Sequence, residues 1–367
     1  MSKNDKHIKV ILSGGGTGGH IFPALAIANE IKARFPQAEI LFVGAKGRME
    51  MEKIPAAGYP IEGLWISGIN RSQKWKNIAF PFKLLSALFK SYKILHRFKP
   101  DFVVGTGGFA SGALLFAAQK KGIPTFIQEQ NSYPGITNKL LAKKADKIYT
   151  AYDGLETYFD AGKTIKTGNP VRKDLQNLAT DKQTALHKFG LSSGRKTILA
   201  VGGSLGAQPI NKAIEKILPE LKKSNYQLIW QTGKTHYDTF QKYEDESVKV
   251  LPFIAGMQDA YAAADLIISR AGASSISELS MLAKPVILIP SPYVAEDHQT
   301  KNAQALARKQ AAVLLKENEL DKLFQSIREV LENEETARQL SQNIKHFAMP
   351  DAAKHIVDDI VKTIQNK

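Results

Sequence analysis

Three glycine-rich segments follow short apolar runs, and their residue types suit the binding of phosphate. They lie at residues 14–20, 105–112 and 202–206. Glycine has no Cβ, so its backbone can approach a ligand closely or adopt a positive φ. A helix that begins just after such a turn offers free N–H groups and the positive end of its dipole, which together suit a diphosphate. A single loop is no more than a tight turn in many proteins, but three of them favour phosphate binding.

The first of these loops does not complete either of two common nucleotide motifs. Gly14, Gly16 and Gly19 match G-x-G-x-x-G, but the dinucleotide fingerprint also needs an acid at the end of the second strand. That strand, expected at 40–43, is followed by Gly-Ala-Lys-Gly-Arg at 44–48. The chain also has no G-x-x-x-x-G-K-[ST]. The sequence therefore argues against a dinucleotide enzyme and against a P-loop triphosphatase.

The elements that must position these loops alternate short β-branched runs with helical patterns, which is typical of parallel α/β sheets. Strands are expected at 8–12, 40–43, 102–105, 125–128 and 147–150, and again at 197–201, 227–231, 249–251, 266–269 and 286–290. Both halves open with an apolar strand, a glycine turn and a helix. We predict an α/β protein of two Rossmann-like parallel-sheet domains that face each other across a cleft, with ligands at the carboxyl ends of the strands.

The predicted boundary between the domains lies at residues 168–172. Asn169 precedes Pro170 and is expected to form a hinge, because a residue before proline avoids the α region. The predicted domains are residues 1–169 with 350–367, and residues 170–349. The final stretch has a helical pattern with Pro350 in its middle. We expect a terminal helix that is kinked there and crosses back to the first domain.

The composition narrows the class of protein. Its 367 residues suit two domains, a hydrophobic fraction of 43% argues against disorder, and the absence of cysteine excludes disulfides and cysteine-based zinc sites. Nothing in the first residues suggests export, and no run approaches the roughly 18 apolar residues of a membrane span. A formal charge of +15 points to a polyanionic partner. The chain lacks nucleic-acid-binding motifs, so we expect anionic lipid or a phosphorylated substrate and no nucleic acid.

The basic charge is concentrated between Arg71 and Lys99, where eight Lys or Arg residues occur without an acid. A helix expected at 78–97 has an apolar side and a basic side. The apolar side is Leu84, Leu85, Leu88, Phe89, Tyr92 and Leu95, the basic side is Lys83, Lys90, Lys93 and Arg97, and Trp75, Phe80 and Phe82 lie at or before its start. Such a helix suits an anionic membrane surface, although an apolar stripe can equally pack on a sheet. We expect part of the stripe to pack inward and the 75–82 segment to meet lipid.

An ordered set of motifs between residues 8 and 310 resembles the MurG family. The motifs are residues 14–24, 107–112, 128–131, 168–172, 202–206, 270–278 and 297–299. The family comprises UDP-N-acetylglucosamine (UDP-GlcNAc) transferases that convert lipid I to lipid II in peptidoglycan synthesis, and it has the GT-B fold. The chain departs from the family in one place. The familiar His-Glu-Gln-Asn is Gln-Glu-Gln-Asn here, so Gln128 cannot take any role of an imidazole.

The resemblance implies a set of site residues. Arg172 and Ser204 would contact the donor diphosphate, Ile254 would meet uracil through its backbone, and Glu278 would hold the ribose. A helix would open towards the nucleotide with Ala273, Ser274, Ser275, Ile276 and Ser277. The GlcNAc ring would be bound by Gln299, Thr17, Gly18, Gly19 and Asn131. The acceptor diphosphate would be bound by Gly15, Gly16, Gly107, Gly108 and Ser111.

The resemblance also implies an inverting transfer to lipid I at the cytoplasmic face of the cell membrane. Such a transfer needs a general base and a stabiliser for UDP. His20 is a candidate base because imidazole titrates near neutral pH, and Glu129 is its rival. The chain has no Asp-x-Asp, so we expect Arg172 and a helix dipole to act without metal or cofactor. Alternatives are another GT-B enzyme, such as a glycolipid glycosyltransferase or a UDP-GlcNAc 2-epimerase, and a non-catalytic UDP-sugar-binding subunit.

Overall fold

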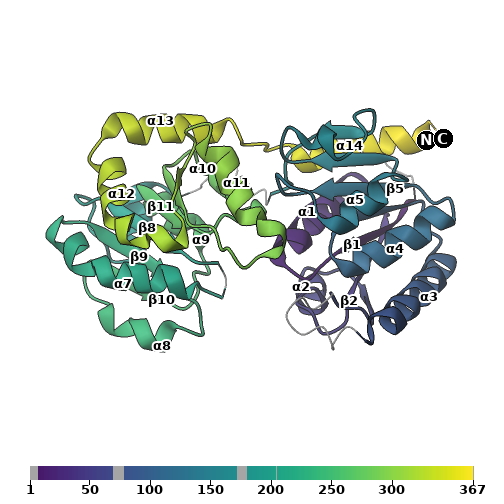
Figure 1. The fold of residues 1–367 in the computed structure, drawn as a ribbon, viewed down its shortest axis with the longest axis horizontal. Helices are drawn as coiled ribbons and strands as arrows, with labels where there is room; N and C mark the ends of the chain where they lie inside the picture. The colour runs from purple at the N-terminus through teal and green to yellow at the C-terminus, as the bar shows by residue number, and fades with distance from the viewer. Residues whose placement is uncertain (1–6, 69–77, 172–179, 204, 367) are drawn as a thin grey trace. The chain divides into compact units, whose positions relative to one another are not determined.

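The chain divides into two compact units, which we describe separately. In the computed structural model, unit 1 comprises Met1–Val171 with Asp351–Lys367, and unit 2 comprises Arg172–Pro350 (Figure 1). The structure describes residues 7–68, 78–171, 180–203 and 205–366. Of the described residues, none belongs to a helix that is both long and apolar enough to cross a membrane.

Unit 1 is built on a parallel sheet of seven strands in the order β3-β2-β1-β4-β5-β6-β7. The strands are β1 (Lys9–Gly14), β2 (Glu39–Ala45), β3 (Ile61–Leu64), β4 (Phe102–Gly107), β5 (Thr125–Glu129), β6 (Lys147–Thr150) and β7 (Thr164–Lys166). The strand order runs outward in opposite directions from β1 and β4. Ligands of open α/β sheets bind at such a switch point, beyond the carboxyl ends of the strands.

Helices cover both faces of this sheet, as the buried and nearly continuous apolar runs of its strands require. They are α1 (Gly18–Arg34), α2 (Glu50–Ala56), α3 (Phe80–Phe98), α4 (Phe109–Lys120), α5 (Ile136–Ala142) and α14 (Ala352–Gln365). In the layer that contains α3, α4 and α5, α4 packs against both of its neighbours (Figure 1). On the other side, α14 packs on α1 and contributes Ile356, Val357 and Ile360 to the core.

Unit 2 repeats this plan with a parallel sheet of six strands in the order β10-β9-β8-β11-β12-β13. The strands are β8 (Thr197–Val201), β9 (Gln227–Gln231), β10 (Val248–Leu251), β11 (Leu266–Ser269), β12 (Val286–Leu288) and β13 (Val313–Leu314). The order reverses between β8 and β11, so the switch point of this unit lies at the carboxyl ends of those two strands.

The helices of unit 2 cover its sheet in the same way. They are α6 (Lys182–Lys188), α7 (Gln208–Lys223), α8 (Tyr237–Phe240), α9 (Met257–Ala263), α10 (Ala273–Leu282), α11 (His298–Ala307), α12 (Leu323–Leu331) and α13 (Glu334–Lys345). One apolar core lies beneath α7 and α12 and includes the fully buried Trp230 of β9. The two units therefore have separate cores, each large enough to hold a sheet in place.

The predicted fold class is confirmed: both units are Rossmann-like, and all the paired strands are parallel. The ten expected strands are present, and their ends differ from the expected ones by at most two residues. The sequence analysis missed β3, β7 and β13, which have four, three and two residues and lie at sheet edges. A strand of that length has too few side chains to show a pattern, and an edge strand is buried on fewer sides.

The expected kinked terminal helix is wrong in its detail. Helix α13 ends at Lys345 and α14 begins at Ala352, so Pro350 lies in the connection between two helices. Proline lacks the N–H that a helix interior needs, and here it separates the helices completely. The last of them, α14, belongs to unit 1.

Helix α3 has two apolar stripes where the sequence analysis predicted one. Its buried residues are Ala87, Ser91, Ile94 and Leu95, which face α4 and the sheet. A second stripe, formed by Ile78 just before α3 and by Phe82, Leu85 and Phe89 on it, points to solvent, and these residues are 75%, 68%, 66% and 77% exposed. Their spacing of four, three and four residues places them on one side of a helix. Part of the predicted stripe packs inward and part does not.

Two of the three lysines predicted to lie opposite the apolar side, Lys83 and Lys90, form hydrogen bonds within unit 1. Lys83 Nζ donates to Ser67 Oγ at 3.0 Å and lies 5.8 Å from the Trp65 ring. Lys90 Nζ donates to the Gly63 carbonyl oxygen at 2.8 Å. Both side chains are therefore half-buried against the segment that begins with β3, whereas Lys93 is exposed.

Candidate active site

The N-terminus of α1 presents unused hydrogen-bond donors at the switch point of unit 1. Thr17 is the N-cap residue in an extended conformation, and its side chain does not cap the helix. The N–H groups of Gly18 and Gly19 have no acceptor among the described residues, while those of His20 and Ile21 bond to the Thr17 carbonyl oxygen. Free N–H groups at a helix N-terminus attract anions and sugar oxygens. The structure thus leaves Thr17, Gly18 and Gly19 available for a ligand.

Gly15 and Gly16 do not offer their N–H groups to a diphosphate, which contradicts their predicted role. The Gly15 N–H donates to the Gly107 carbonyl oxygen at 3.3 Å, and the Gly16 N–H donates to Glu50 Oε2 at 2.9 Å. Glu50 is fully buried, and its other oxygen accepts the Ala45 N–H at 3.0 Å. The carboxylate of Glu50 therefore holds the loop where the prediction placed a phosphate.

The second glycine loop is glycine-rich because other backbone and ring atoms approach it closely. Gly107 has a φ of +111°, and a Cβ there would lie 2.7 Å from the His20 ring. Gly108 has a φ of +92°, and a Cβ there would lie 2.6 Å from the Gly15 carbonyl oxygen. Both positions are therefore closed to side chains. Their binding of an acceptor diphosphate stays a prediction.

The side chain of Ser111 lies inside unit 1, which does not support its predicted contact with a diphosphate. The residue is fully buried, and its Oγ has no hydrogen-bond partner among the described residues. A Cβ on Gly105 would lie 2.6 Å from that oxygen. The side chain therefore points from α4 down onto β4, away from the carboxyl edge of the sheet.

His20 lies in the first turn of α1 with its ring over Gly107. Its Nδ1 is 2.9 Å from Gln130 Oε1, and Nε2 has no partner among the described residues. The Thr106 hydroxyl donates to the His20 carbonyl oxygen at 2.7 Å and so ties this turn to β4. The imidazole is half-buried, held at one nitrogen and open at the other. This arrangement suits a group that accepts a proton from a ligand.

Glu129 is not placed as a general base, which contradicts the alternative that it serves as one. The residue is only 1% exposed. Oε1 accepts the N–H and the side-chain amide of Asn131 at 3.0 and 3.2 Å, and Oε2 accepts the Gly135 N–H at 3.1 Å and Asn138 Nδ2 at 2.8 Å. A carboxylate has about four acceptor sites, and all of them are filled. Glu129 shapes the loop after β5, and Asn131 is bound to it.

The predicted donor residues of unit 2 gather where its strands end. The loops after β8 and β9 touch at Gly206 and Gly233, where a Cβ would lie 1.9 Å from the Thr232 carbonyl oxygen and 2.1 Å from that of Leu205, respectively. Both glycines have positive φ. The glycines of this segment are therefore required by the close packing of two loops, which does not by itself indicate a ligand.

Helix α10 begins at the switch point of unit 2 and carries six of the predicted residues. Its N-cap residue is Gly272, and no side chain caps the helix. The N–H groups of Ala273, Ser274 and Ser275 have no acceptor among the described residues, while that of Ile276 bonds to the Gly272 carbonyl oxygen. These free donors and the helix dipole suit a diphosphate.

The side chains of α10 differ in their access to a ligand. Ile276 is buried, and Ser277 Oγ donates to the Ala273 carbonyl oxygen at 2.9 Å, so neither side chain faces a ligand. Glu278 is half-buried and accepts a hydrogen bond from the Tyr261 hydroxyl at 3.3 Å. Its carboxylate can accept further bonds.

Two predicted contacts of unit 2 are partly occupied by protein groups. The Ile254 N–H donates to Gln231 Oε1 at 2.8 Å, which leaves the Ile254 carbonyl oxygen as the backbone group for uracil. Gln299 Oε1 accepts the Ser291 N–H at 2.9 Å, so its amide N–H₂ is the group left for a sugar. Each residue follows a strand of unit 2 as predicted, but one of its polar groups is already bound by the protein.

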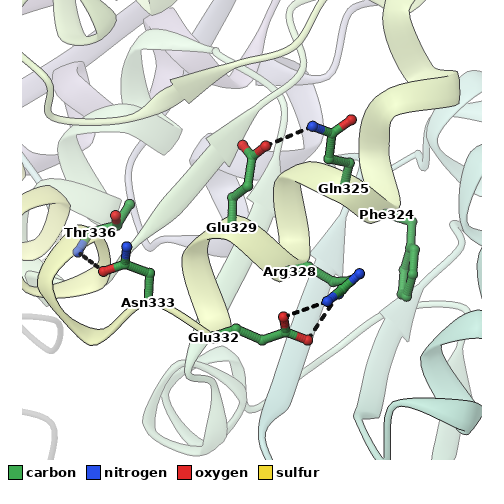
Figure 2. A pocket seen from close by; sticks show the side chains of 7 residues that line it. All are labelled: Phe324, Gln325, Arg328, Glu329, Glu332, Asn333 and Thr336. Atoms are coloured by element: carbon green, nitrogen blue, oxygen red, sulfur yellow. Dashed lines mark hydrogen bonds and ion pairs between the residues drawn. The ribbon is translucent and has the colours of Figure 1, made fainter.

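Three predicted residues, Trp75, Arg172 and Ser204, lie outside the described residues. Elsewhere in unit 2, a surface pocket on α12 and α13 contains none of the predicted residues (Figure 2). Its polar side chains pair with one another: Arg328 with Glu332, Gln325 with Glu329, and Asn333 with the Thr336 N–H. Its lining comes from α12, α13 and the turn between them, and it is not a candidate site.

Three residues that organise these loops were not predicted from the sequence: Glu50, Gln130 and Gln231. Glu50 follows a glycine-rich turn at the start of a helix, and a carboxylate in that place is usually solvated. Gln130 lies inside the motif at residues 128–131, but the resemblance implied no role for it. Gln231 ends β9, where an amide is unusual for a buried strand, and that signal could have singled it out.

Two Rossmann-like units, each with a glycine loop and an uncapped helix N-terminus at its switch point, define the class of GT-B proteins. Within that class, the chain belongs to glycosyltransferase family 28. The N-terminal domain model of the family matches residues 10–150, and its C-terminal domain model matches residues 197–356.

Similar proteins match the whole length of the chain. A protein of Flavobacterium psychrophilum named UDP-N-acetylglucosamine–N-acetylmuramyl-(pentapeptide) pyrophosphoryl-undecaprenol N-acetylglucosamine transferase is 56% identical over 361 residues, which are 98% of both chains. A protein of Christiangramia forsetii with the same name is 55% identical over 98% of this chain and 99% of its own. The crystal structure of Acinetobacter baumannii MurG has a TM-score of 0.77 at 29% identity, covering 97% of this chain and 99% of that one.

A UDP-GlcNAc 2-epimerase of Neisseria meningitidis, solved with UDP-GlcNAc bound, also has a similar structure. Its TM-score is 0.68 at 16% identity, and the match covers 97% of this chain. That likeness shows a shared fold alone. The epimerase alternative is therefore compatible with the fold, whereas the family of the chain is a glycosyltransferase family.

Proposed function

We propose that this chain transfers GlcNAc from UDP-GlcNAc to the 4-hydroxyl of N-acetylmuramic acid in lipid I, giving lipid II for peptidoglycan. The observation that carries the proposal is the full-length similarity to relatives named for this transfer, at 56% and 55% identity. The site geometry agrees with it, because unit 1 offers a base beside an anion-binding helix end and unit 2 offers a second such helix end.

In the proposed mechanism, unit 1 binds the acceptor. His20 Nε2 takes the proton of the 4-hydroxyl as its oxygen attacks C1 of the donor sugar. The N–H groups of Gly18 and Gly19, with Thr17 and Asn131, bind the GlcNAc of the donor. Attack from the face opposite UDP breaks the C1–O bond and inverts the configuration from α to β. The backbone donors of Gly107 and Gly108 are the remaining candidates for the acceptor diphosphate.

Unit 2 is the proposed donor unit. The free N–H groups of Ala273, Ser274 and Ser275 and the dipole of α10 stabilise the diphosphate as negative charge develops on the leaving UDP. Glu278 accepts hydrogen bonds from the ribose, the Ile254 carbonyl oxygen accepts from uracil, and Gln299 donates to the GlcNAc ring. Arg172 and Ser204 complete the diphosphate contacts.

The exposed stripe of α3 is the proposed contact with an anionic membrane at its cytoplasmic face. Contiguous exposed apolar residues are unusual on a free surface. Phe116 on α4 and Ile136 and Leu140 on α5 add to them, at 42%, 53% and 72% exposure. The exposed lysines Lys93 and Lys120 supply charge for anionic headgroups. This arrangement would bring the chain to a polyprenyl-linked acceptor.

The membrane contact is tested with vesicles that contain phosphatidylglycerol. The change Phe82→Ser with Phe89→Ser removes apolar area from the stripe, and Lys93→Glu with Lys120→Glu removes charge. We expect both double variants to sediment with vesicles at least tenfold less, since each removes a term of interfacial binding. Lys309→Glu with Lys345→Glu, which reverses two exposed charges on unit 2, is the control and should bind as the parent does. Equal binding by all variants would contradict the contact.

The transfer itself is tested by UDP release from UDP-GlcNAc in EDTA, with and without a lipid I analogue. Release that requires the acceptor supports the metal-independent transfer. Formation of N-acetylmannosamine and UDP without acceptor would replace the proposal with an epimerase. Binding of UDP-GlcNAc without any release would replace it with a binding subunit.

A further inference from the structure

The side chain of Gln130 connects the proposed base to the sheet. Gln130 follows the last residue of β5 and is only 1% exposed. Its Oε1 lies 2.9 Å from His20 Nδ1. On the other side of the amide, Nε2 donates to the Thr106 carbonyl oxygen at 2.8 Å, to the Gln128 carbonyl oxygen at 2.9 Å and to Gln128 Oε1.

These contacts fix which way the amide faces. Three oxygen atoms surround one end of the Gln130 amide, and an oxygen placed there would be repelled by all of them. That end must be the N–H₂ group, so the oxygen faces His20. An amide oxygen only accepts hydrogen bonds, so His20 Nδ1 must carry a proton. In neutral imidazole the other nitrogen, Nε2, then has the free lone pair.

We propose that Gln130 is a positioning residue that fixes the neutral His20 in its Nδ1–H tautomer, so that Nε2 is the nitrogen that accepts a proton. The catalytic consequence rests on the proposed function, but the tautomer does not. Free histidine in water favours the opposite tautomer, with the proton on Nε2, and that form has no lone pair for the acceptor hydroxyl. The hydrogen bond from Nδ1 to Gln130 therefore selects the competent base.

The surrounding groups keep this arrangement rigid. Gln128 Nε2 donates to Asn169 Oδ1 at 2.8 Å, and Asn169 Nδ2 donates to the Gln130 carbonyl oxygen at 3.1 Å. All three residues are at least 96% buried. The His20 ring rests on Gly107, where a side chain would displace it. Both partners of the hydrogen bond are thus held in place by their neighbours.

The charged groups on the elements around His20 do not compete with this hydrogen bond. Glu129 on β5 is bound to Asn131, Gly135 and Asn138. Glu50 on α2 is bound to the backbone of Gly16 and Ala45. Neither carboxylate forms an ion pair with the imidazole, so a neutral amide is the group that sets the protonated nitrogen.

The tautomer is read directly by NMR of the full chain labelled with ¹⁵N-histidine, above the pH at which His20 ionises. The His20 signals are assigned by their loss in His20→Asn. We expect the shifts of a protonated Nδ1 and an unprotonated Nε2. A protonated Nε2 in the unaltered protein would overturn the inference without any variant.

Gln130→Met tests the cause, because methionine has nearly the same shape and cannot accept the proton of Nδ1. We expect the Nε2–H tautomer and a fall in kcat of about 10- to 100-fold, with the KM for UDP-GlcNAc unchanged. The matched control is Gln119→Met, since Gln119 also bridges a side chain and a carbonyl oxygen in unit 1, at 3.2 and 3.0 Å, without touching His20. Retention of Nδ1–H in Gln130→Met, or an equal fall in kcat in the control, would overturn the inference.

Gln130→Glu supplies a second variant that keeps an oxygen against Nδ1. We expect the Nδ1–H form to persist, and the acidic limb of kcat/KM against pH to move to higher pH, because a carboxylate stabilises imidazolium. A merely structural role would leave that limb in place. If the tautomer behaves as proposed and His20→Asn retains full kcat, the base assignment fails while the tautomer inference stands.

Discussion

At the scale of single residues, two buried carboxylates of unit 1, Glu50 and Glu129, hold loops through hydrogen bonds. Glu50 and Glu129 are each at least 99% buried, and their oxygens accept backbone or amide N–H groups. Burial of a charge is costly unless hydrogen bonds compensate it. Each carboxylate therefore fixes the shape of a loop at the carboxyl ends of the strands, and His20 remains the proposed base.

Glu129→Gln separates these two roles. The amide would place N–H₂ against groups that donate, so we expect the free energy of unfolding of the protein to fall by about 1–3 kcal/mol. The acidic limb of the pH–rate profile should keep its position. His20→Asn should show the reverse pattern, with kcat reduced at least about 100-fold and the melting temperature nearly unchanged. Denaturant unfolding and steady-state kinetics on both variants check this, and a stable but inactive Glu129→Gln would restore it as the base.

Gly107→Ala tests the space beneath the imidazole. A Cβ would lie 2.7 Å from the ring at a φ of +111°, so we expect the His20 ring to move and kcat to fall at least about tenfold. Gly122→Ala is the matched control, because Gly122 has a φ of +70° with no atom within 4 Å of the added Cβ. The control carries only backbone strain of about 1 kcal/mol, and its kcat should be unchanged. Equal loss of kcat in both variants would show that strain alone is responsible.

At the scale of elements, polar contacts of helix α14 join the last helix of the chain to the rest of unit 1. Helix α14 reaches unit 1 from the far end of the chain. Its Asp359 accepts a hydrogen bond from the Tyr149 hydroxyl at 2.9 Å, and Asp358 pairs with Arg34 of α1. Burial and the neighbouring Asp359 raise the pKa of Tyr149 far above its ordinary value, so this hydroxyl remains a donor at every physiological pH.

Ile356→Ala tests the docking of α14. Ile356 is fully buried in the core of unit 1, so we expect the free energy of unfolding to fall by about 2–4 kcal/mol. Lys362→Ala on the exposed side of α14 is the control and should change it by less than about 0.5 kcal/mol. Denaturant unfolding measures both. An equal, small effect would mean that α14 contributes little to the stability of unit 1.

Asp245→Asn tests the turn before β10 and its dependence on pH. Burial would raise the pKa of Asp245, but hydrogen bonds from Lys222 and Ser247 outweigh it and lower the pKa from 3.8 to about 2. A lowered pKa in the folded state stabilises the protein above pH 3.8, and this contribution is lost as the pH falls towards 2.

Because solvent screens this partly exposed side chain, we expect Asp245→Asn to cost about 1 kcal/mol of unfolding free energy at pH 7. The difference from the parent should disappear below about pH 2. Urea unfolding at several pH values measures it, with Asp321→Asn, an exposed carboxylate, as the control. A difference that does not depend on pH would contradict the lowered pKa.

At the scale of the whole molecule, the chain uses one architectural plan twice. Each unit has its own sheet, core and switch point, with an uncapped helix N-terminus at that point in α1 and in α10. This duplication suits a transfer between two diphosphate compounds, since each unit can bind one of them. Substitutions at the proposed nucleotide contacts of unit 2 should then affect UDP-GlcNAc and not the lipid acceptor.

Glu278→Ala tests this division of labour. Loss of the proposed ribose contact should raise the KM for UDP-GlcNAc about tenfold, equivalent to about 1.4 kcal/mol, and leave the KM for the lipid acceptor unchanged. Glu334→Ala, on an exposed helix of unit 2, should change neither. Steady-state kinetics with each substrate varied would show it. Unchanged UDP-GlcNAc affinity in Glu278→Ala would remove that residue from the donor site.

The sequence by itself determined the fold class, because strands that are buried on both faces appear in the sequence as continuous apolar runs. It also placed Thr17 and His20 at the start of the helix that follows the first strand, since glycine turns and helix starts are encoded locally. Only the tertiary structure decided which polar atoms remain free. Gly16, Glu129 and Ser111 lie in the predicted loops, yet their polar groups are bound or buried. Hydrogen-bond partners such as Glu50 and Gly16, 34 residues apart, come together only when the sheet forms, so no local pattern reveals them.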